Sequence, residues 1–514
     1  MFVETRVKTV SLAADTLELF SALTDKGKDV LLFESRDSCG ESGLKSLLFV
    51  GNALRIEGRG DEVTLTSLSS GGRDALRALL PELENLGEVK SDNEKTVIRI
   101  ATGARTGSDI DRVKTASTLD VLRLISMGWV ETGGGGAPVR VPGVFAYDLV
   151  EQYESLPEAR ADGHGFPDFV FWLPARVVVL NHMTEEAEFV EYLYGVPSQA
   201  GAGSWIPDLE KLESHGVPSQ AGAGSWRGDL DVHVDMGDDE YAALVERVKE
   251  HIRAGDVFQI VPSRTFSMAC PDPLAAFDAL RRSNPSPYMF YLNWEGFTLF
   301  GSSPEACVRV SGTPLSVQIH PIAGTRPRGK TEEGEIDVEL DTRFEAELRL
   351  NEKELAEHMM LVDLARNDVA RINRPGTRRV ASLTEVERYS HVMHLVSVVE
   401  GELREDLDAL HAYAASANMG TLVGAPKIEA ARLLRRYEAD RRGPYGGAVG
   451  YLTSEGELDT AIVIRSALVR DGVAYIRAGA GVVFDSDPAA EADETRNKAN
   501  AVLEAIRIAA EVAR

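Results

Sequence analysis

Cysteine is scarce in this sequence, and no long apolar run is present. The three cysteines, Cys39, Cys270 and Cys307, are far apart and odd in number, which excludes a disulfide framework or a cysteine zinc site. No apolar stretch approaches the ~18–20 residues that a membrane span needs. The first residues lack the basic-then-apolar layout of a signal peptide. The chain is therefore expected to be cytoplasmic and reduced.

Lysine is also scarce, with 13 lysines against 42 arginines and a formal net charge of −26. So acidic a chain is not expected to bind nucleic acid or an anionic membrane. An anionic substrate would need a metal ion or a few well-placed Arg and Lys side chains. Acidity combined with a lysine deficit favours a high-salt cytoplasm, such as that of a halophilic archaeon, over an ordinary acidic protein.

The length of 514 residues allows two to four average domains or one large composite domain. Residues 195–205 recur identically at 216–226 in a stretch rich in Gly, Ser and Pro. A recent duplication inside a linker explains this better than a binding loop or a solenoid unit. We therefore predict an N-terminal region (1–190), a linker (191–231) and a C-terminal core (232–514).

Local patterns predict several elements of the chain. Residues 238–254 have the pattern of an amphipathic helix, and a last helix is expected from Pro488 to about Val512, with Asp487 as its N-cap. Residues 44–56 are predicted to form a pair of strands.

One acidic segment begins at Asn351, which forms a capping-box-like start with Glu354. Glu354, Glu357, His358 and Leu361 then share one helical face. Carboxylates beside apolar residues are costly unless a cation meets them. On this segment alone, a solvated helix face is the simpler interpretation.

A second acidic segment lies on the last helix, where Glu491, Glu494 and Lys498 share a face. One or two carboxylates from each of two helices suit Mg²⁺, which keeps water ligands and accepts a substrate oxygen. Alone, this signal is also weak, because charged last helices are common.

A glycine-containing segment, Gly479-Ala480-Gly481, follows the strand that leads to Arg465. Small residues let backbone N–H groups approach an anionic oxygen, and an arginine can clamp a carboxylate with two hydrogen bonds. A tight strand pair that needs glycine for packing is the alternative.

Residues 324–331 fit the phosphate-loop pattern letter for letter. Pro327 removes one of the amides that such a loop needs, and the acidic stretch that follows does not open an apolar-faced helix. The sequence therefore disfavours a nucleotide-binding enzyme.

His391 and His394 would form a two-histidine metal site only on a helix. Their Val and aromatic neighbours favour a strand, which places the two side chains on opposite faces. One histidine acting as an acid or base is the better interpretation.

Taken together and in order, these segments resemble the chorismate-utilising enzyme family over most of residues 232–506. The resemblance also includes residues 258–263, Ser303-Pro304-Glu305, residues 321–326, 424–427 and 445–447. It implies an α+β fold with two large, mostly antiparallel β-sheets packed as a sandwich and helices on the outside. The phosphate-loop match is then explained as the chorismate-contacting Gly-Thr pair of this family.

Two positions distinguish the branches of the family. Isochorismate- and salicylate-forming members carry a lysine base where this chain has Gln259, and aminodeoxychorismate-forming members usually carry lysine where it has Ala323. The resemblance therefore implies the anthranilate-forming branch, with the aminodeoxychorismate-forming branch as the alternative. A non-catalytic tryptophan sensor is disfavoured, since every expected acidic, Arg, Tyr and His position is filled.

The resemblance implies a Mg²⁺-dependent lyase of tryptophan biosynthesis. Chorismate and ammonia would give anthranilate and pyruvate through aminodeoxyisochorismate. The implied metal ligands are Glu357 and Glu494. Glu354 and Glu491 are implied to support these ligands or to reach the metal through water. The implied catalytic residues are His394, Glu305 and Thr421. The implied substrate-binding residues are Gly324, Thr325, Tyr445, Arg465, Gly479, Ala480, Gly481, Lys498 and Gln259.

The N-terminal region resembles the same branch more loosely. Residues 31–35 and 284–290 are similar to two walls of a tryptophan inhibitor site, although 284–290 alone would be taken for a proline turn into a strand. The residues implied to hold tryptophan are Ser35, Lys45, Pro287, Tyr288 and Met289.

Two further features bear on partners and substrate. None of the three cysteines stands in a glutaminase motif, so ammonia is expected from a separate glutamine amidotransferase subunit. Residues 417–424 depart from the commoner family pattern Phe-Pro-Ala-Gly-Thr-Leu-Ser-Gly, which predicts a reshaped substrate wall near Thr421.

Overall fold

A computed structural model describes residues 1–12, 14–24, 27–35, 44–92, 94–101, 107–132, 136–195, 230–331, 334–389 and 392–512. The duplicated segment lies almost wholly outside these residues, as do Cys39 and His391. In the described residues no helix is long and apolar enough to cross a membrane.

The strands of the N-terminal half are β1 (Phe2–Ser11), β2 (Val30–Glu34), β3 (Lys45–Arg59), β4 (Glu62–Ser67), β5 (Glu88–Ser91), β6 (Lys95–Arg99), β7 (Val130–Glu131), β8 (Arg140–Phe145), β9 (Phe169–Asn181) and β10 (Glu186–Tyr194). The first strands after residue 230 are β11 (His233–Val234), β12 (Gln259–Ile260), β13 (Ser263–Ala269), β14 (Tyr288–Trp294), β15 (Phe297–Ser303), β16 (Ala306–Ser311), β17 (Ser316–Ile319) and β18 (Ile322–Pro327). The last strands are β19 (Arg379–Arg388), β20 (Val392–Glu402), β21 (Gly424–Ala425), β22 (Ala448–Thr453), β23 (Leu458–Ile462), β24 (Ser466–Arg470) and β25 (Val473–Gly479).

The helices of the N-terminal half are α1 (Thr16–Thr24), α2 (Ser70–Leu86), α3 (Asp109–Val113), α4 (Leu119–Met127) and the 3-10 helix η1 (Tyr147–Gln152). Those of the C-terminal half are α6 (Asp238–Ala254), α7 (Pro273–Ser283), α8 (Val338–Leu350), α9 (Glu352–Ile372), α10 (Ala409–Ser416), α11 (Gly420–Val423), α12 (Lys427–Tyr437) and α13 (Pro488–Val512).

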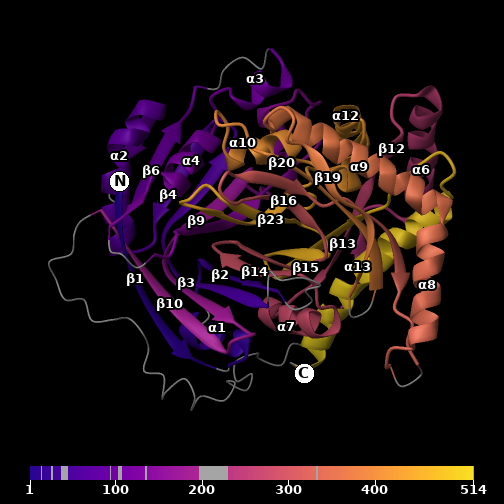
Figure 1. Cartoon of the computed structure of the whole chain (residues 1–514), viewed down its shortest axis with the longest axis horizontal. Helices are drawn as coiled ribbons and strands as arrows, with labels where there is room; N and C mark the ends of the chain where they lie inside the picture. Colours follow the sequence, from indigo (N-terminus) through magenta and orange to yellow (C-terminus); the bar gives the residue numbers. More distant parts are fainter. Residues whose placement is uncertain are drawn as a thin grey trace.

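Antiparallel strand pairing dominates the fold. A continuous hydrogen-bonded network joins 23 strands, and β12 pairs separately with β21. Among the described residues only β1 and β7 pair in parallel. Figure 1 shows β9, β16, β20 and β23 lying above β2, β14 and β15, with α9, α12, α8 and α13 on the outside. The predicted α+β class with packed sheets and external helices is confirmed.

Strands of the two halves pair with each other. β2 lies beside β14, with Phe33 opposite Phe290, and β8 lies beside β22, with Phe145 opposite Ala448. The largest buried apolar cluster likewise contains residues of both halves, such as Phe171 and Tyr413. The N-terminal region therefore contributes directly to the sheets that carry the C-terminal residues.

Helix boundaries followed from local sequence. α6 spans Asp238–Ala254 as predicted, and α13 begins at Pro488, where Asp487 Oδ1 accepts the Ala490 N–H at 2.9 Å. Asn351 Oδ1 accepts the Glu354 N–H at 3.0 Å, so Asn351 is the N-cap of α9, while the Glu354 carboxylate accepts from Arg326 Nη1 at 3.2 Å. These signals are local because a cap satisfies N–H groups within its own first turn.

The prediction of a strand pair at 44–56 was wrong, because these residues belong to the single strand β3. β3 pairs with β9 along its length, with register shifts between Phe49 and Leu54. Bulges at these shifts keep the residues in one continuous strand.

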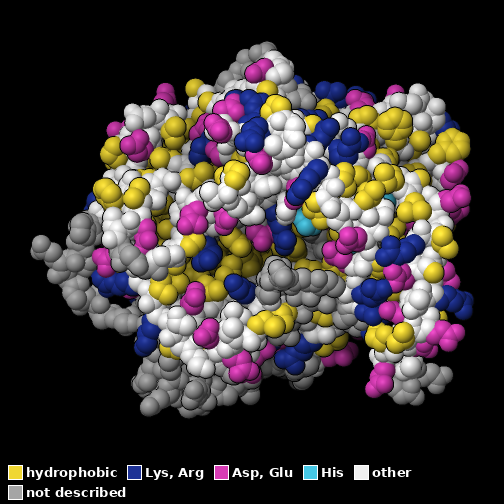
Figure 2. Space-filling model, viewed as in Figure 1, with side chains coloured by type: hydrophobic (Ala, Val, Ile, Leu, Met, Phe, Trp, Pro, Cys, Tyr) yellow, Lys and Arg dark blue, Asp and Glu magenta, His cyan; other side chains and the backbone are white. Residues whose placement is uncertain are grey.

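Acidic and basic side chains are interspersed over the face shown in Figure 2. The negative charge of the chain therefore does not gather in one patch on this face.

Candidate active site

An arginine without a partner marks the centre of the candidate site. Arg465 lies between β23 and β24 in the left-handed region, with φ of 49°, and its carbonyl accepts the Ser302 N–H at 3.1 Å. Its half-buried side chain makes no hydrogen bond or ion pair with any residue that the structure describes. Burial lowers the pKa of Arg465, which the charges of Glu494 and Glu305 oppose. An unpaired guanidinium in such a place is a ready site for an anion.

The glycines at and after the end of β25 let the backbone pass close to Tyr445 and Gln259. A Cβ on Gly479 would lie 2.7 Å from the Pro262 carbonyl oxygen and 3.1 Å from Tyr445 Oη. A Cβ on Gly481 would lie 2.8 Å from Gln259 Nε2. β25 also pairs tightly with β13. The tight strand pair that needs glycine for packing is therefore confirmed, whereas anion binding by this segment stays a prediction.

Glu305 and Thr421 form one wall of the site. Thr421 Oγ1 donates to Glu305 Oε1 at 2.9 Å. Burial raises the pKa of Glu305 to about 7, against the opposing effects of the Thr421 hydrogen bond and the charges of Lys498 and Arg465. Near neutral pH this carboxyl group can therefore hold a proton that it can donate. The unusual sequence at 417–424 keeps Thr421 in contact with Glu305.

Lys498 links α13, the helix that carries Glu491 and Glu494, to the glycine segment. Its Nζ donates to the Gly479 carbonyl oxygen at 3.0 Å and pairs with Glu494 Oε1 at 2.6 Å.

His394 lies on β20, opposite Thr325 of β18. Its Nδ1 is 3.0 Å from Thr325 Oγ1 and 3.2 Å from the Gly324 carbonyl oxygen. Burial lowers the pKa of His394, so the ring is neutral at pH 7. If Nδ1–H donates to the carbonyl oxygen, Nε2 keeps a lone pair that can accept a proton. The phosphate-loop pattern begins in strand β18, which runs beside His394 and ends at Pro327. A phosphate loop would lead directly into a helix, but here the next helix, α8, begins only at Val338.

The acidic residues of α9 and α13 lie close to the same place. Gln259 Nε2 donates to Glu357 Oε1 at 3.1 Å. Burial raises the pKa of Glu357, as do the nearby charges of Glu354 and Glu494. One buried oxygen of Glu491 has no hydrogen-bond partner among the described residues. Crowded carboxylates with an unsatisfied oxygen fit a cation.

The described residues hold no group of three or more His, Cys, Asp or Glu side chains that could bind a metal by themselves. The chemistry of the donors, all carboxylates, fits an ion that keeps water ligands and takes further oxygens from a substrate.

A buried charge network behind Tyr445 was missed by the sequence analysis. Glu438 accepts from the Ser263 N–H at 2.9 Å, from Arg442 Nη2 at 2.6 Å and from Arg477 Nη2 at 3.0 Å. The Arg442 guanidinium lies 5.7 Å from the centre of the Tyr445 ring. Burial alone would raise the pKa of Glu438, but the charges of Arg442 and Arg477 lower it to about 2. Nothing local in the sequence distinguishes these residues from surface charges.

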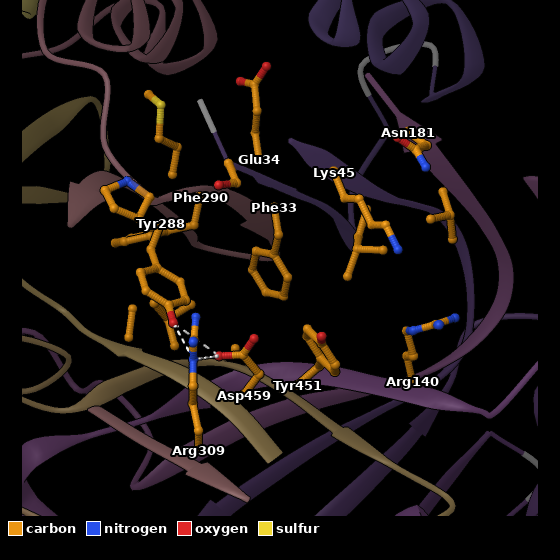
Figure 3. Close-up of a pocket in the computed structure, with 18 of the residues that line it drawn as sticks. Phe33, Glu34, Lys45, Arg140, Asn181, Tyr288, Phe290, Arg309, Tyr451 and Asp459 are labelled. Atoms are coloured by element: carbon orange, nitrogen blue, oxygen red, sulfur yellow. Dashed lines mark hydrogen bonds and ion pairs between the residues drawn. The ribbon is translucent and has the colours of Figure 1, made fainter. Parts of the chain in front are cut away.

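The five residues predicted to hold tryptophan meet in a second place, a cavity of about 280 Å³. Figure 3 shows that Lys45, Arg140 and Asn181 surround its interior together with Tyr288, Tyr451 and Asp459. All five predicted residues line this cavity: Ser35, Lys45, Pro287, Tyr288 and Met289. The cavity therefore offers cations, a carboxylate and apolar walls within one enclosure.

Comparisons with known proteins show the family of the chain. The family model described as chorismate binding enzyme matches residues 78–504. Anthranilate synthase component 1 of Vibrio cholerae is 48% identical over 493 residues, covering 96% of this chain and 94% of that protein. The protein of that name from Escherichia coli is 46% identical over 493 residues, with the same coverage.

Solved structures show the same fold. Anthranilate synthase component I from Streptococcus pneumoniae is 28% identical, with a TM-score of 0.65, and the match covers 90% of this chain and 93% of that one. The menaquinone-specific isochorismate synthase MenF from Escherichia coli has a TM-score of 0.61 at 17% identity, covering 98% of this chain and 94% of that one, which shows the fold alone. The chain therefore belongs to the chorismate-binding enzymes, and within them to the anthranilate synthase component 1 family.

Proposed function

We propose that this enzyme converts chorismate and ammonia to anthranilate and pyruvate through aminodeoxyisochorismate, as a step of tryptophan biosynthesis. The observation that carries the proposal is the unpaired Arg465 guanidinium, which lies near a carboxyl group, Glu305, whose pKa is about 7. Chorismate is a dianion that must lose a ring hydroxyl, so it needs both a cation and a proton donor. The relatives named anthranilate synthase component 1 support the same reaction.

Binding of the substrate would use the groups gathered around Arg465. Arg465, the Tyr445 hydroxyl and the backbone N–H groups of Gly479 and Gly481 would hold the enolpyruvyl carboxylate, since the Ala480 N–H already donates to the Pro262 carbonyl oxygen at 3.3 Å. Thr325 would orient the ring. These groups lie at the ends of strands of a rigid sheet, which favours accurate positioning of the bound substrate.

Mg²⁺ would be held by Glu357 and Glu494, with Glu354 and Glu491 behind them or joined through water. The raised pKa of Glu357 and of Glu491 supports this, because in each case burial and a neighbouring carboxylate disfavour the free anion. When bound, the ion would coordinate the ring carboxylate of chorismate and draw electron density from the ring.

The chain's own residues supply the proton transfers. Glu305 would donate its proton to the departing C4 hydroxyl, which leaves as water, while ammonia adds at C2. Gln259 is no base, which suits a nucleophile that arrives as neutral ammonia. The C2 proton is then lost, the ether bond between the ring and the enolpyruvyl group breaks, and the released enolpyruvate takes up a proton on its methylene carbon to become pyruvate. His394 assists this step, so a His394→Ala variant should accumulate aminodeoxyisochorismate.

Two partners complete the proposal. Ammonia would come from a separate glutamine amidotransferase subunit. Tryptophan would inhibit the enzyme from the cavity lined by Lys45 and Tyr288, where cations and the Asp459 carboxylate suit the two charges of an amino acid.

The direct test incubates the chain with chorismate, Mg²⁺ and ammonium at high pH and follows the fluorescence of anthranilate. We expect anthranilate and pyruvate in equal amounts, and inhibition on addition of tryptophan. Formation of aminodeoxychorismate in place of anthranilate would contradict the proposed reaction.

The role of Glu305 predicts a pH dependence. The protonated acid is present below its pKa of about 7, so kcat/KM for chorismate at constant free ammonia should fall above that pH. Glu305→Gln should lose this limb and about 10²–10⁴-fold in rate. Thr421→Val removes a hydrogen bond that lowers the pKa of Glu305, so the limb should move to higher pH. A wild-type profile that stays flat between pH 6 and 8 would refute this assignment.

A further inference from the structure

The cavity and the candidate active site share strand β23. Asp459 and Ala461 line the cavity, and the strand ends at Ile462, whose N–H donates to the Glu305 carbonyl oxygen at 3.0 Å. Arg465 follows three residues later. At about 3.3 Å per extended residue, Ala461 and Arg465 are at most about 13 Å apart. One short segment therefore contacts both places.

A second connection passes through the corner between β15 and β16. Tyr288 of the cavity wall lies opposite Ser303 of β15. Ser303 Oγ accepts the Glu305 N–H at 3.3 Å, and the neighbouring Ser302 N–H donates to the Arg465 carbonyl oxygen. The corner that carries Glu305 therefore touches both the cavity wall and the backbone of Arg465.

Three side chains on the cavity wall tie these strands together, and we refer to Tyr288, Arg309 and Asp459 as the triad. Arg309 Nε donates to Tyr288 Oη at 2.8 Å and to Asp459 Oδ1 at 3.2 Å. Tyr288 Oη donates to Asp459 Oδ1 at 3.2 Å. Figure 3 shows these bonds at one end of the cavity. The triad thus joins β14 to the paired strands β16 and β23, and both of these strands contact the backbone of Glu305.

We infer that the triad is the positioning element through which a ligand in the cavity changes the active site. The inference rests on the proposed tryptophan site. An amino-acid ammonium group would compete for the Asp459 carboxylate, and its carboxylate would compete for Arg309. Either contact breaks bonds within the triad and frees β14 to shift against β16 and β23, which stay paired with each other through their backbones.

Glu305 and Arg465 would move with these strands. Arg465 has φ of 49°, a conformation that is costly for a residue other than glycine, so a change of backbone conformation at this position would relieve strain. The ligand inhibits because it binds more tightly to the arrangement in which the triad is broken.

The test uses Tyr288→Phe, which removes the triad's central hydroxyl and keeps the ring that lines the cavity. The coupling factor is the ratio of kcat/KM for chorismate without and with saturating tryptophan, and calorimetry confirms that tryptophan is bound. Allosteric coupling is commonly about 5–150-fold, so we expect the variant's factor to fall at least about fivefold.

Tyr451→Phe is the matched control, because Tyr451 lines the same cavity and its hydroxyl makes no hydrogen bond with the described residues. It should keep the wild-type coupling factor. Arg309→Lys provides a second variant that keeps the charge and loses the planar donors, and it should weaken coupling as Tyr288→Phe does.

A Tyr288→Phe or Arg309→Lys enzyme that binds tryptophan and keeps the wild-type coupling factor would overturn the role of the triad. Failure of the wild-type enzyme to bind tryptophan would instead refute the proposed inhibitor site, and with it the ligand on which the inference depends.

Discussion

Arg465→Met is expected to lower kcat/KM for chorismate by about 10²–10³-fold, the usual loss when one preorganised donor to a reacting anion is removed. The guanidinium has no partner among the described residues, so it is available to the substrate. The same change should stabilise the fold by about 1–3 kcal/mol, because burying an unpaired polar group carries a cost of this size. Steady-state kinetics and urea unfolding of the same preparation measure both effects.

The opposite signs of these two effects make the prediction specific. Arg507→Met is the matched control, because Arg507 lies on the surface in an exposed pair with Glu504. Its effects on rate and on stability should be small, within about 0.5 kcal/mol for stability. An Arg465→Met variant that loses activity together with stability would show that the side chain supports the fold and would contradict a binding role.

Glu438→Gln is expected to destabilise the protein by about 3–5 kcal/mol, the cost of breaking a buried ion pair from one side. Glu438 is buried between Arg442 and Arg477, and the substitution leaves both guanidinium groups without their counter-charge. Urea unfolding monitored by fluorescence measures the change. Activity should also fall, since Arg442 packs against Tyr445.

The pH dependence of stability gives an independent check on Glu438. Its pKa is lowered to about 2 in the folded state from an ordinary value of 4.5. The stability that it contributes is therefore fully present above about pH 4.5 and is lost as pH falls toward 2. The Glu438→Gln variant should lack this part of the acid dependence, whereas Glu504→Gln on the surface should keep it. Equal acid sensitivity of wild type and Glu438→Gln would count against the network.

The candidate site could be predicted from the sequence where its residues stand in long, specific motifs. Glu305 and Thr421 are brought into hydrogen-bond contact, as are Thr325 and His394. The metal ligands Glu357 and Glu494, the inhibition by tryptophan and the amidotransferase partner stay predictions. The high-salt origin, suggested by the lysine deficit, also stays a prediction.

The sequence by itself determined the span of α6 and the first residues of α9 and α13, because caps and the 3.6-residue period act within one or two turns of chain. It also determined which residue types were available for the site. Only the tertiary structure decided that residues 45–56 belong to one bulged strand, since the partner β9 begins more than a hundred residues later. It alone decided the partners of Glu438 and the triad of Tyr288, Arg309 and Asp459. Antiparallel pairing brings such distant residues together, and no local pattern records which strands will meet.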